Sequence, residues 1–161
     1  MRAFYLSALP LVCALSVPAN AQLLNQKAIP AAMAMTIAQV AIDTCRTNGY
    51  AVSVSVVGRA GEVILQVRGD GTGPHTVENS FRKAYTARTF RGPSAALVKR
   101  LKDDPQLSLI HLNNVVASAG AFPIKAGEDV IGAVGVSGAP GGDKDEVCAQ
   151  AGIDKVADQL K

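Results

Sequence analysis

The sequence contains no tryptophan, and aromatic residues make up only 4% of its 161 positions. Proteins that bind single-stranded nucleic acid stack the bases on aromatic side chains, which this chain can hardly supply. Its formal net charge of +3 is also too small to indicate a polyanionic partner. Nucleic acid is therefore not an expected ligand.

Histidine is equally scarce, because His75 and His111 are the only two in the chain. They lack the H-x-x-x-H spacing that places two metal ligands on one helix face, so no structural zinc site is expected. A haem iron, in contrast, needs only one protein nitrogen as its axial ligand. His75 lies between a glycine-rich loop and a predicted helix, where its side chain would be held out from the core. His111 lies in an apolar stretch, which favours a core or interface position.

The chain has three cysteines, and Cys13 belongs to an expected leader, which leaves Cys45 and Cys148. Each of these two lies on an apolar stripe that steps by four residues, so both thiols are expected on buried helix faces. In an oxidising compartment such a pair predicts a disulfide between the first and last helices. Two unlinked buried cysteines are the alternative.

The only long uncharged apolar run is at the N-terminus, where Leu6–Val17 follows Arg2. It is too short to span a bilayer, which needs roughly 20 apolar residues. It ends at Pro18–Ala21, whose small residues suit a leader peptidase. We expect residues 1–21 to be a signal peptide, and residues 22–161 to form one periplasmic or secreted domain without membrane attachment. Loss of Arg2 leaves 15 bases against 13 acids, a net charge of +2.

Hydrophobic periodicity predicts helices that alternate with β-hairpins. An amphipathic helix is expected from about Ile29 to Asn48. A strand follows at Ala51–Val57, with the alternation of a half-buried strand, and its antiparallel partner is Val63–Val67. The other predicted elements are helices starting near Thr76 and spanning about Ser94–Lys102, strands at Phe122–Ile124 and Asp129–Val136, and a last helix from Asp143 almost to Lys161, capped by Asp143 and Glu146. This order implies an antiparallel sheet with helices on its faces.

No motif for hydrolysis or nucleotide binding is complete. Ser137 lies between Val136 and Gly138, which is not the G-x-S-x-G nucleophile elbow. The glycines from Gly132 to Gly142 form neither a G-x-G-x-x-G nor a Walker A loop. We expect them to allow close packing and a wide turn.

A stretch from Arg82 to Lys102 contains bases but no acid. Its members are Arg82, Lys83, Arg88, Arg91, Lys99, Arg100 and Lys102. Arginines in such a cluster can pair with the carboxylates of a ligand. A solvated helix face is the alternative.

Several segments, in order and spacing, resemble the GlcG/HbpS family of haem-binding and haem-degrading-type domains. The resemblance spans nearly the whole mature chain and rests on Ala51–Val57, Arg68–Gly71, Arg82–Ala87, Phe122–Ile124, Ile131–Ala139 and Asp145–Ala149. It implies an α/β chain of the α+β type, with a profilin-like antiparallel sheet of about five strands flanked by helices. It also implies assembly into homo-oligomers and a connection with haem.

The first hypothesis is an exported haem-binding protein in which His75 ligates the iron and Arg82 or Arg88 faces the propionates, with Tyr85 as a further contact. Because neutral imidazole is the ligating form, haem binding should weaken below about pH 6.5, where free histidine gains a proton. Haem degradation would also need access of peroxide or oxygen to the iron. The alternatives are an oligomeric module that binds a small anionic metabolite in the glycine loop, and an accessory structural subunit.

Overall fold

The computed structural model describes residues 22–161, so the expected leader lies outside the described residues. Two hairpins and the helices between and around them follow the predicted order. The helices are α1 (Ala31–Thr47), α2 (Thr76–Phe90), α3 (Ala95–Asp103) and α4 (Gly142–Lys155), with short 3-10 helices η1 (Ser108–His111) and η2 (Ala157–Gln159). The strands are β1 (Ser53–Val57), β2 (Val63–Val67), β3 (Ala121–Ala126) and β4 (Asp129–Ser137).

The strands form one antiparallel sheet in the order β2-β1-β4-β3. Both predicted hairpins are present, and β1 joins them by pairing with β4 from Ser53↔Ser137 to Val57↔Ala133. The expected α+β fold with an antiparallel sheet flanked by helices is confirmed, and residues 22–161 contain four strands where about five were expected. The stretch between α3 and β3 forms η1 and a loop in which Asn114 has a φ of 64°, and it adds no strand.

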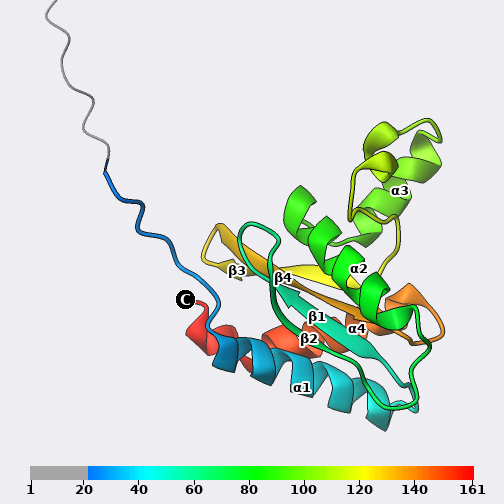
Figure 1. Ribbon diagram of the computed structural model, residues 1–161, viewed down its shortest axis with the longest axis horizontal. Helices are drawn as coiled ribbons and strands as arrows, with labels where there is room; N and C mark the ends of the chain where they lie inside the picture. The colour runs from blue at the N-terminus through cyan, green and yellow to red at the C-terminus, as the bar shows by residue number, and fades with distance from the viewer. Residues whose placement is uncertain (1–21) are drawn as a thin grey trace, which may run out of the picture.

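Helices cover both faces of the sheet, with α1 and α4 on one side and α2 on the other (Figure 1). All five residues of β1 are buried, so the prediction of a half-buried strand is wrong. Its alternation instead separates an apolar face from a hydroxyl face that packs under α2. Ser53 shares a hydrogen bond of 2.8 Å with Thr76, and Ser55 shares one of 2.7 Å with Ser80.

The apolar core lies between the sheet and the α1–α4 pair, and a disulfide joins these two helices. The bond links Cys45 to Cys148, with 5.5 Å between their Cα atoms, which confirms the predicted pairing in the structure. The helices approach closely at Gly152, where a Cβ would lie 2.5 Å from the Ile37 carbonyl oxygen. The apolar stripes noted in the sequence are therefore the contact faces of α1 and α4.

The last helix differs from its prediction at both ends. It begins at Gly142 after Gly141, and no side chain caps its first turn, so the expected capping box of Asp143 and Glu146 does not form. Glu146 lies instead near the Gly120 backbone, and burial raises the pKa of its carboxyl group. The helix ends at Lys155, and the chain continues as η2.

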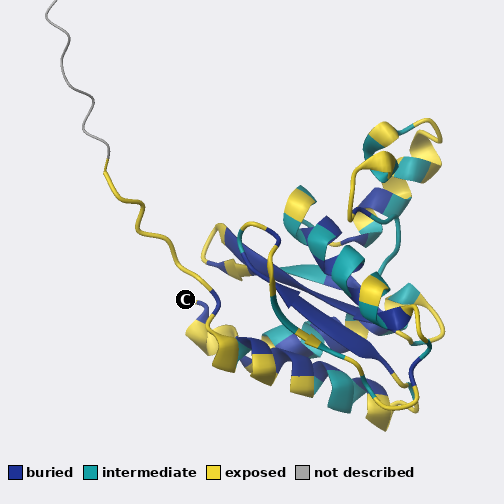
Figure 2. Ribbon diagram, in the orientation of Figure 1, coloured by how far each residue is buried: buried dark blue, intermediate teal, exposed yellow. Residues whose placement is uncertain are grey.

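The segment of α3 and η1 projects from the sheet and its covering helices (Figure 1). Figure 2 shows that its surface is largely exposed or half-buried, in contrast to the buried sheet. Only Leu97 of α3 is buried. Within residues 22–161, no helix has the length and apolar character needed to cross a membrane.

Candidate functional site

The N-terminal turn of α2 presents His75 at the rim of a hollow of about 350 Å³. The lining residues are His75, Glu78, Asn79 and Arg82. Their spacing of three, four and seven residues places them on one face of the helix. His75 is exposed, and a Cβ at Gly73 would lie 3.0 Å from its Cε1 atom, so the glycine leaves room for the imidazole.

Arg82 is held in place by the loop that precedes β3. Its Nη2 donates to the Val115 carbonyl oxygen at 2.8 Å, and its Nη1 lies 3.9 Å from Glu78 Oε1. Asn79 is fixed as well, because its Nδ2 donates to Ser137 Oγ at 3.0 Å. These hydrogen bonds hold the side chains of Asn79 and Arg82 in place within the hollow. His75 offers the hollow an exposed imidazole nitrogen that could ligate a metal.

The other predicted site residues lie away from His75. Arg88 is 13 residues further along α2, which corresponds to about 20 Å of helix. Tyr85 packs beside the β1–β2 turn, where a Cβ at Gly61 would lie 2.6 Å from its ring. His111 is exposed in η1, so of the expected core or interface position the core alternative is wrong. The structure therefore brings His75 and Arg82 together, and places Arg88 and Tyr85 away from His75.

Glu78 and Asn79 were missed in the sequence, although their spacing from His75 was a usable signal. The i, i+3, i+4, i+7 pattern predicts a shared face once His75 is taken as the start of the helix. A search for apolar residues at that spacing overlooks a polar face of this kind. The hollow consequently contains one carboxylate and one amide that were not expected.

A buried ion pair lies on the other side of α2, where the sequence suggested only a basic cluster. The side chains of Lys83 and Asp145 are both 3% exposed, and Lys83 Nζ donates to Asp145 Oδ2 at 2.7 Å. Lys83 also donates to the Val136 carbonyl oxygen at 3.1 Å, and Asp145 Oδ1 accepts the Ala139 N–H at 3.0 Å. Burial raises the pKa of Asp145, although the Lys83 ammonium opposes the shift. The pair fixes α2 against α4 and is too enclosed to meet a ligand.

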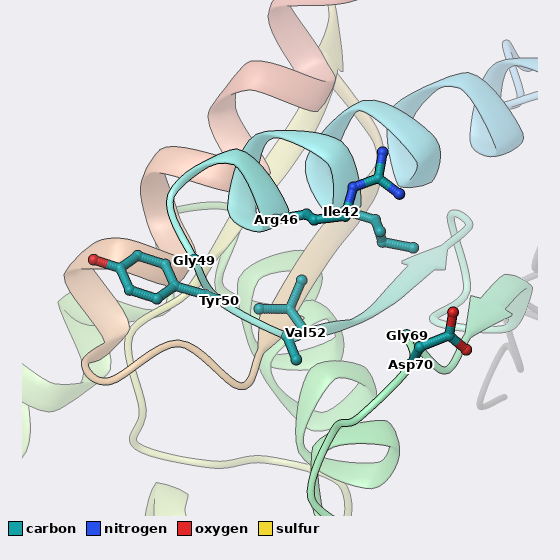
Figure 3. A pocket seen from close by; sticks show the side chains of 8 residues that line it. Ile42, Arg46, Gly49, Tyr50, Val52, Gly69 and Asp70 are labelled. Carbon is teal, nitrogen blue, oxygen red and sulfur yellow. The ribbon is translucent and has the colours of Figure 1, made fainter.

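A second hollow, of about 330 Å³, lies beside the glycine-rich loop (Figure 3). Arg46 of α1 and Asp70 of the loop line it, together with Val52. Arg46 also bonds to Asp43 at 2.6 Å. An anion in this hollow would meet one arginine that already has a partner, and one carboxylate.

The His75 hollow fits part of what a haem requires. His75 offers an exposed nitrogen for the iron, and Arg82 offers a cation for a propionate about two helical turns away. The volume lies at the lower end of the range for ligand pockets, and the lining residues are polar. A haem bound here would therefore keep much of its ring outside the hollow.

The fold and this hollow define a small α+β domain with an exposed histidine at the start of its sheet-covering helix. Residues 29–154 match the family model described as haem degrading protein HbpS-like. The chain belongs to this HbpS-like family. Among curated proteins, no similar sequence was found.

Solved structures of this family have the same fold. A double mutant of HbpS from Streptomyces reticuli is 33% identical with a TM-score of 0.80, and the match covers 88% of this chain and 97% of that chain. A second HbpS structure is 35% identical with a TM-score of 0.80, covering 87% and 99%. Protein ORFY of Klebsiella pneumoniae is 26% identical with a TM-score of 0.79, covering 88% and 98%. A haem complex of PduOC, at 21% identity and a TM-score of 0.73, shares the fold.

Proposed function

We propose that this chain is an exported haem-binding protein in which His75 is the axial ligand of the iron. The observation that carries the proposal is the shared hollow of His75 and Arg82 on α2. Membership of a family described as haem degrading, and the similar fold of a PduOC–haem complex, support haem as the ligand. The disulfide between Cys45 and Cys148 supports export, because disulfides persist in oxidising compartments.

The chain's own residues have distinct tasks in this proposal. His75 supplies a nitrogen from an exposed position beside Gly73, where no bulky side chain obstructs a flat ligand. Arg82, positioned by the Val115 carbonyl, pairs with a propionate carboxylate. Glu78 Oε1 lies 3.9 Å from Arg82 Nη1, so a propionate would share this guanidinium with Glu78. Haem, when bound, would supply an iron centre that can bind small molecules.

Haem titration of the purified mature protein tests this proposal. We expect a Soret band that saturates with one haem per chain, and an affinity at least about tenfold weaker for His75→Ala, or about 1.4 kcal/mol. His111→Ala is the matched control, because His111 is also exposed but lies in η1. Loss of the spectrum in His111→Ala alone would overturn the ligand assignment, and absence of saturable binding in the wild type would overturn the function.

Export can be tested separately from haem binding. The expected leader would leave Gln22 as the first residue of the mature protein. Mass spectrometry of periplasmic or secreted material should therefore find a chain that begins at Gln22. An uncut chain retained in the cytoplasm would contradict export without bearing on haem.

A small anionic metabolite is the second candidate ligand, and the hollow beside the glycine-rich loop favours it through Arg46. Calorimetric titration with small dicarboxylates, compared between the wild type and Arg46→Gln, distinguishes this function from haem binding. Saturable binding that depends on Arg46, together with no binding of haem, would favour the metabolite.

A further inference from the structure

One peptide group of the loop before β3 is held by two side chains of α2 that lie one helical turn apart. The Val115 carbonyl oxygen accepts a hydrogen bond from Arg82 Nη2 at 2.8 Å, and the Val116 N–H donates to Thr86 Oγ1 at 2.9 Å. Because this carbonyl and this N–H belong to the same planar peptide unit, they cannot turn independently of each other. The position of the Val115 carbonyl therefore depends on the hydrogen bond that Thr86 accepts.

Thr86 is buried beneath this loop and does not line the His75 hollow. It is 1% exposed, as is Val115, whereas the Arg82 side chain is 37% exposed and lines the hollow. The Thr86 hydroxyl donates to the Arg82 carbonyl oxygen at 2.8 Å, which leaves its oxygen free to accept the Val116 N–H. This single hydroxyl therefore joins the backbone of α2 to the loop.

We propose that Thr86 is a positioning residue for the carboxylate of the ligand in the His75 hollow. The inference rests on the proposed haem site, in which Arg82 pairs with a propionate. Thr86 fixes the loop peptide, whose carbonyl holds Arg82 Nη2, and the other N–H groups of the guanidinium stay available to the propionate. If the peptide turns, Arg82 keeps the Glu78 carboxylate at 3.9 Å and gains rotamers that ligand binding must then restrict.

Thr86→Val removes the hydroxyl and keeps the size and branched shape of the side chain. The partly buried Val116 N–H then loses its acceptor, so the loop peptide is free to turn. We expect Thr86→Val to bind haem about fivefold more weakly than the wild type, which is the effect of one impaired hydrogen bond. Thr89→Val is the matched control and should keep the wild-type affinity, because Thr89 also donates to a carbonyl oxygen of α2, at 2.8 Å, but is exposed.

Soret titration of these variants in the full mature chain tests the positioning role, with Arg82→Gln as the second change of a double-mutant cycle. In the Arg82→Gln background, Thr86→Val should cause no further loss of affinity, because Thr86 acts only through that guanidinium. Thr86→Ser keeps the hydroxyl and should bind haem like the wild type. A Thr86→Ser protein as weak as Thr86→Val, or losses that add in the double variant, would overturn the inference, because Thr86 would then act through packing.

A measurement on the haem-free protein separates this inference from the proposed function. In NMR relaxation, the Nε–H group of Arg82 should be ordered in the wild type and in Thr89→Val, and more mobile in Thr86→Val. An Arg82 signal that is unchanged in Thr86→Val would overturn the inference whether or not haem binds. Absence of saturable haem binding in the wild type would instead overturn the proposed function, and with it the role of Thr86 toward haem.

Discussion

Removal of Lys83 should destabilise this protein more than removal of any exposed base. In Lys83→Met the Asp145 carboxylate stays buried, at 3% exposure, and loses its 2.7 Å hydrogen bond to an ammonium. Breaking one partner of a buried ion pair costs about 3–5 kcal/mol in free energy of unfolding. With a urea m-value of about 2 kcal/mol/M, the unfolding midpoint should fall by roughly 2 M.

The double variant Lys83→Met/Asp145→Leu separates the charge effect from packing. Replacement of both partners by apolar residues of similar size is often close to neutral, so it should recover most of the loss. The coupling energy between Lys83 and Asp145 follows from urea denaturation of four proteins at one protein concentration: the wild type, both single variants and the double variant. A Lys83→Met variant less stable than the wild type by under about 1 kcal/mol would refute the reasoning, because the carboxylate would then have found water or another partner.

Two further predictions concern the disulfide between α1 and α4 and the ion pair between Arg59 and Asp129. Replacing Cys45 and Cys148 by alanine should lower the free energy of unfolding by about 4.7 kcal/mol in the chain-entropy model, since the bond closes a separation of 103 residues. Two titratable thiols in the native, non-reduced wild type would contradict the bond itself. The Arg59 guanidinium donates to Asp129 and holds the pKa of that carboxyl below its usual range. The stability that this pair contributes is therefore complete above about pH 4 and is lost as the pH falls through the lowered pKa of Asp129. In Asp129→Asn the Tm should therefore fall less steeply with decreasing pH than in the wild type. The same steepness below about pH 4 in both proteins would contradict a contribution from the pair.

The elements that could be predicted from the sequence are those defined by local patterns. Periods of two and of about four residues located both hairpins and all four helices, although the last helix ends at Lys155 and not near Lys161. The paired apolar stripes around Cys45 and Cys148 predicted the contact of α1 with α4, because each stripe needed a partner. His75 was placed correctly at the start of a helix by the glycines and proline before it.

The parts that could not be predicted depend on contacts between distant segments. Lys83 and Asp145 are 62 residues apart, and no local pattern distinguishes Lys83 from the exposed bases around it. Ser53 and Ser55 suggested a solvent-facing side of β1, yet hydroxyls on α2 satisfy them in the interior. A hollow of about 510 Å³ is lined by Phe122 of β3 together with Glu146 and Val147 of α4, and no local pattern predicts that these two elements line one hollow.

Chemical rescue of a glycine variant tests the central claim, that His75 ligates haem iron. In His75→Gly the side chain is removed from an exposed site, so added imidazole can enter the space it leaves. We expect this variant to lose the Soret spectrum of the wild-type complex and to regain its position and intensity with millimolar imidazole, while His111→Gly resembles the wild type without imidazole. A His75→Gly protein that keeps the wild-type spectrum and haem affinity in the absence of imidazole would contradict the claim.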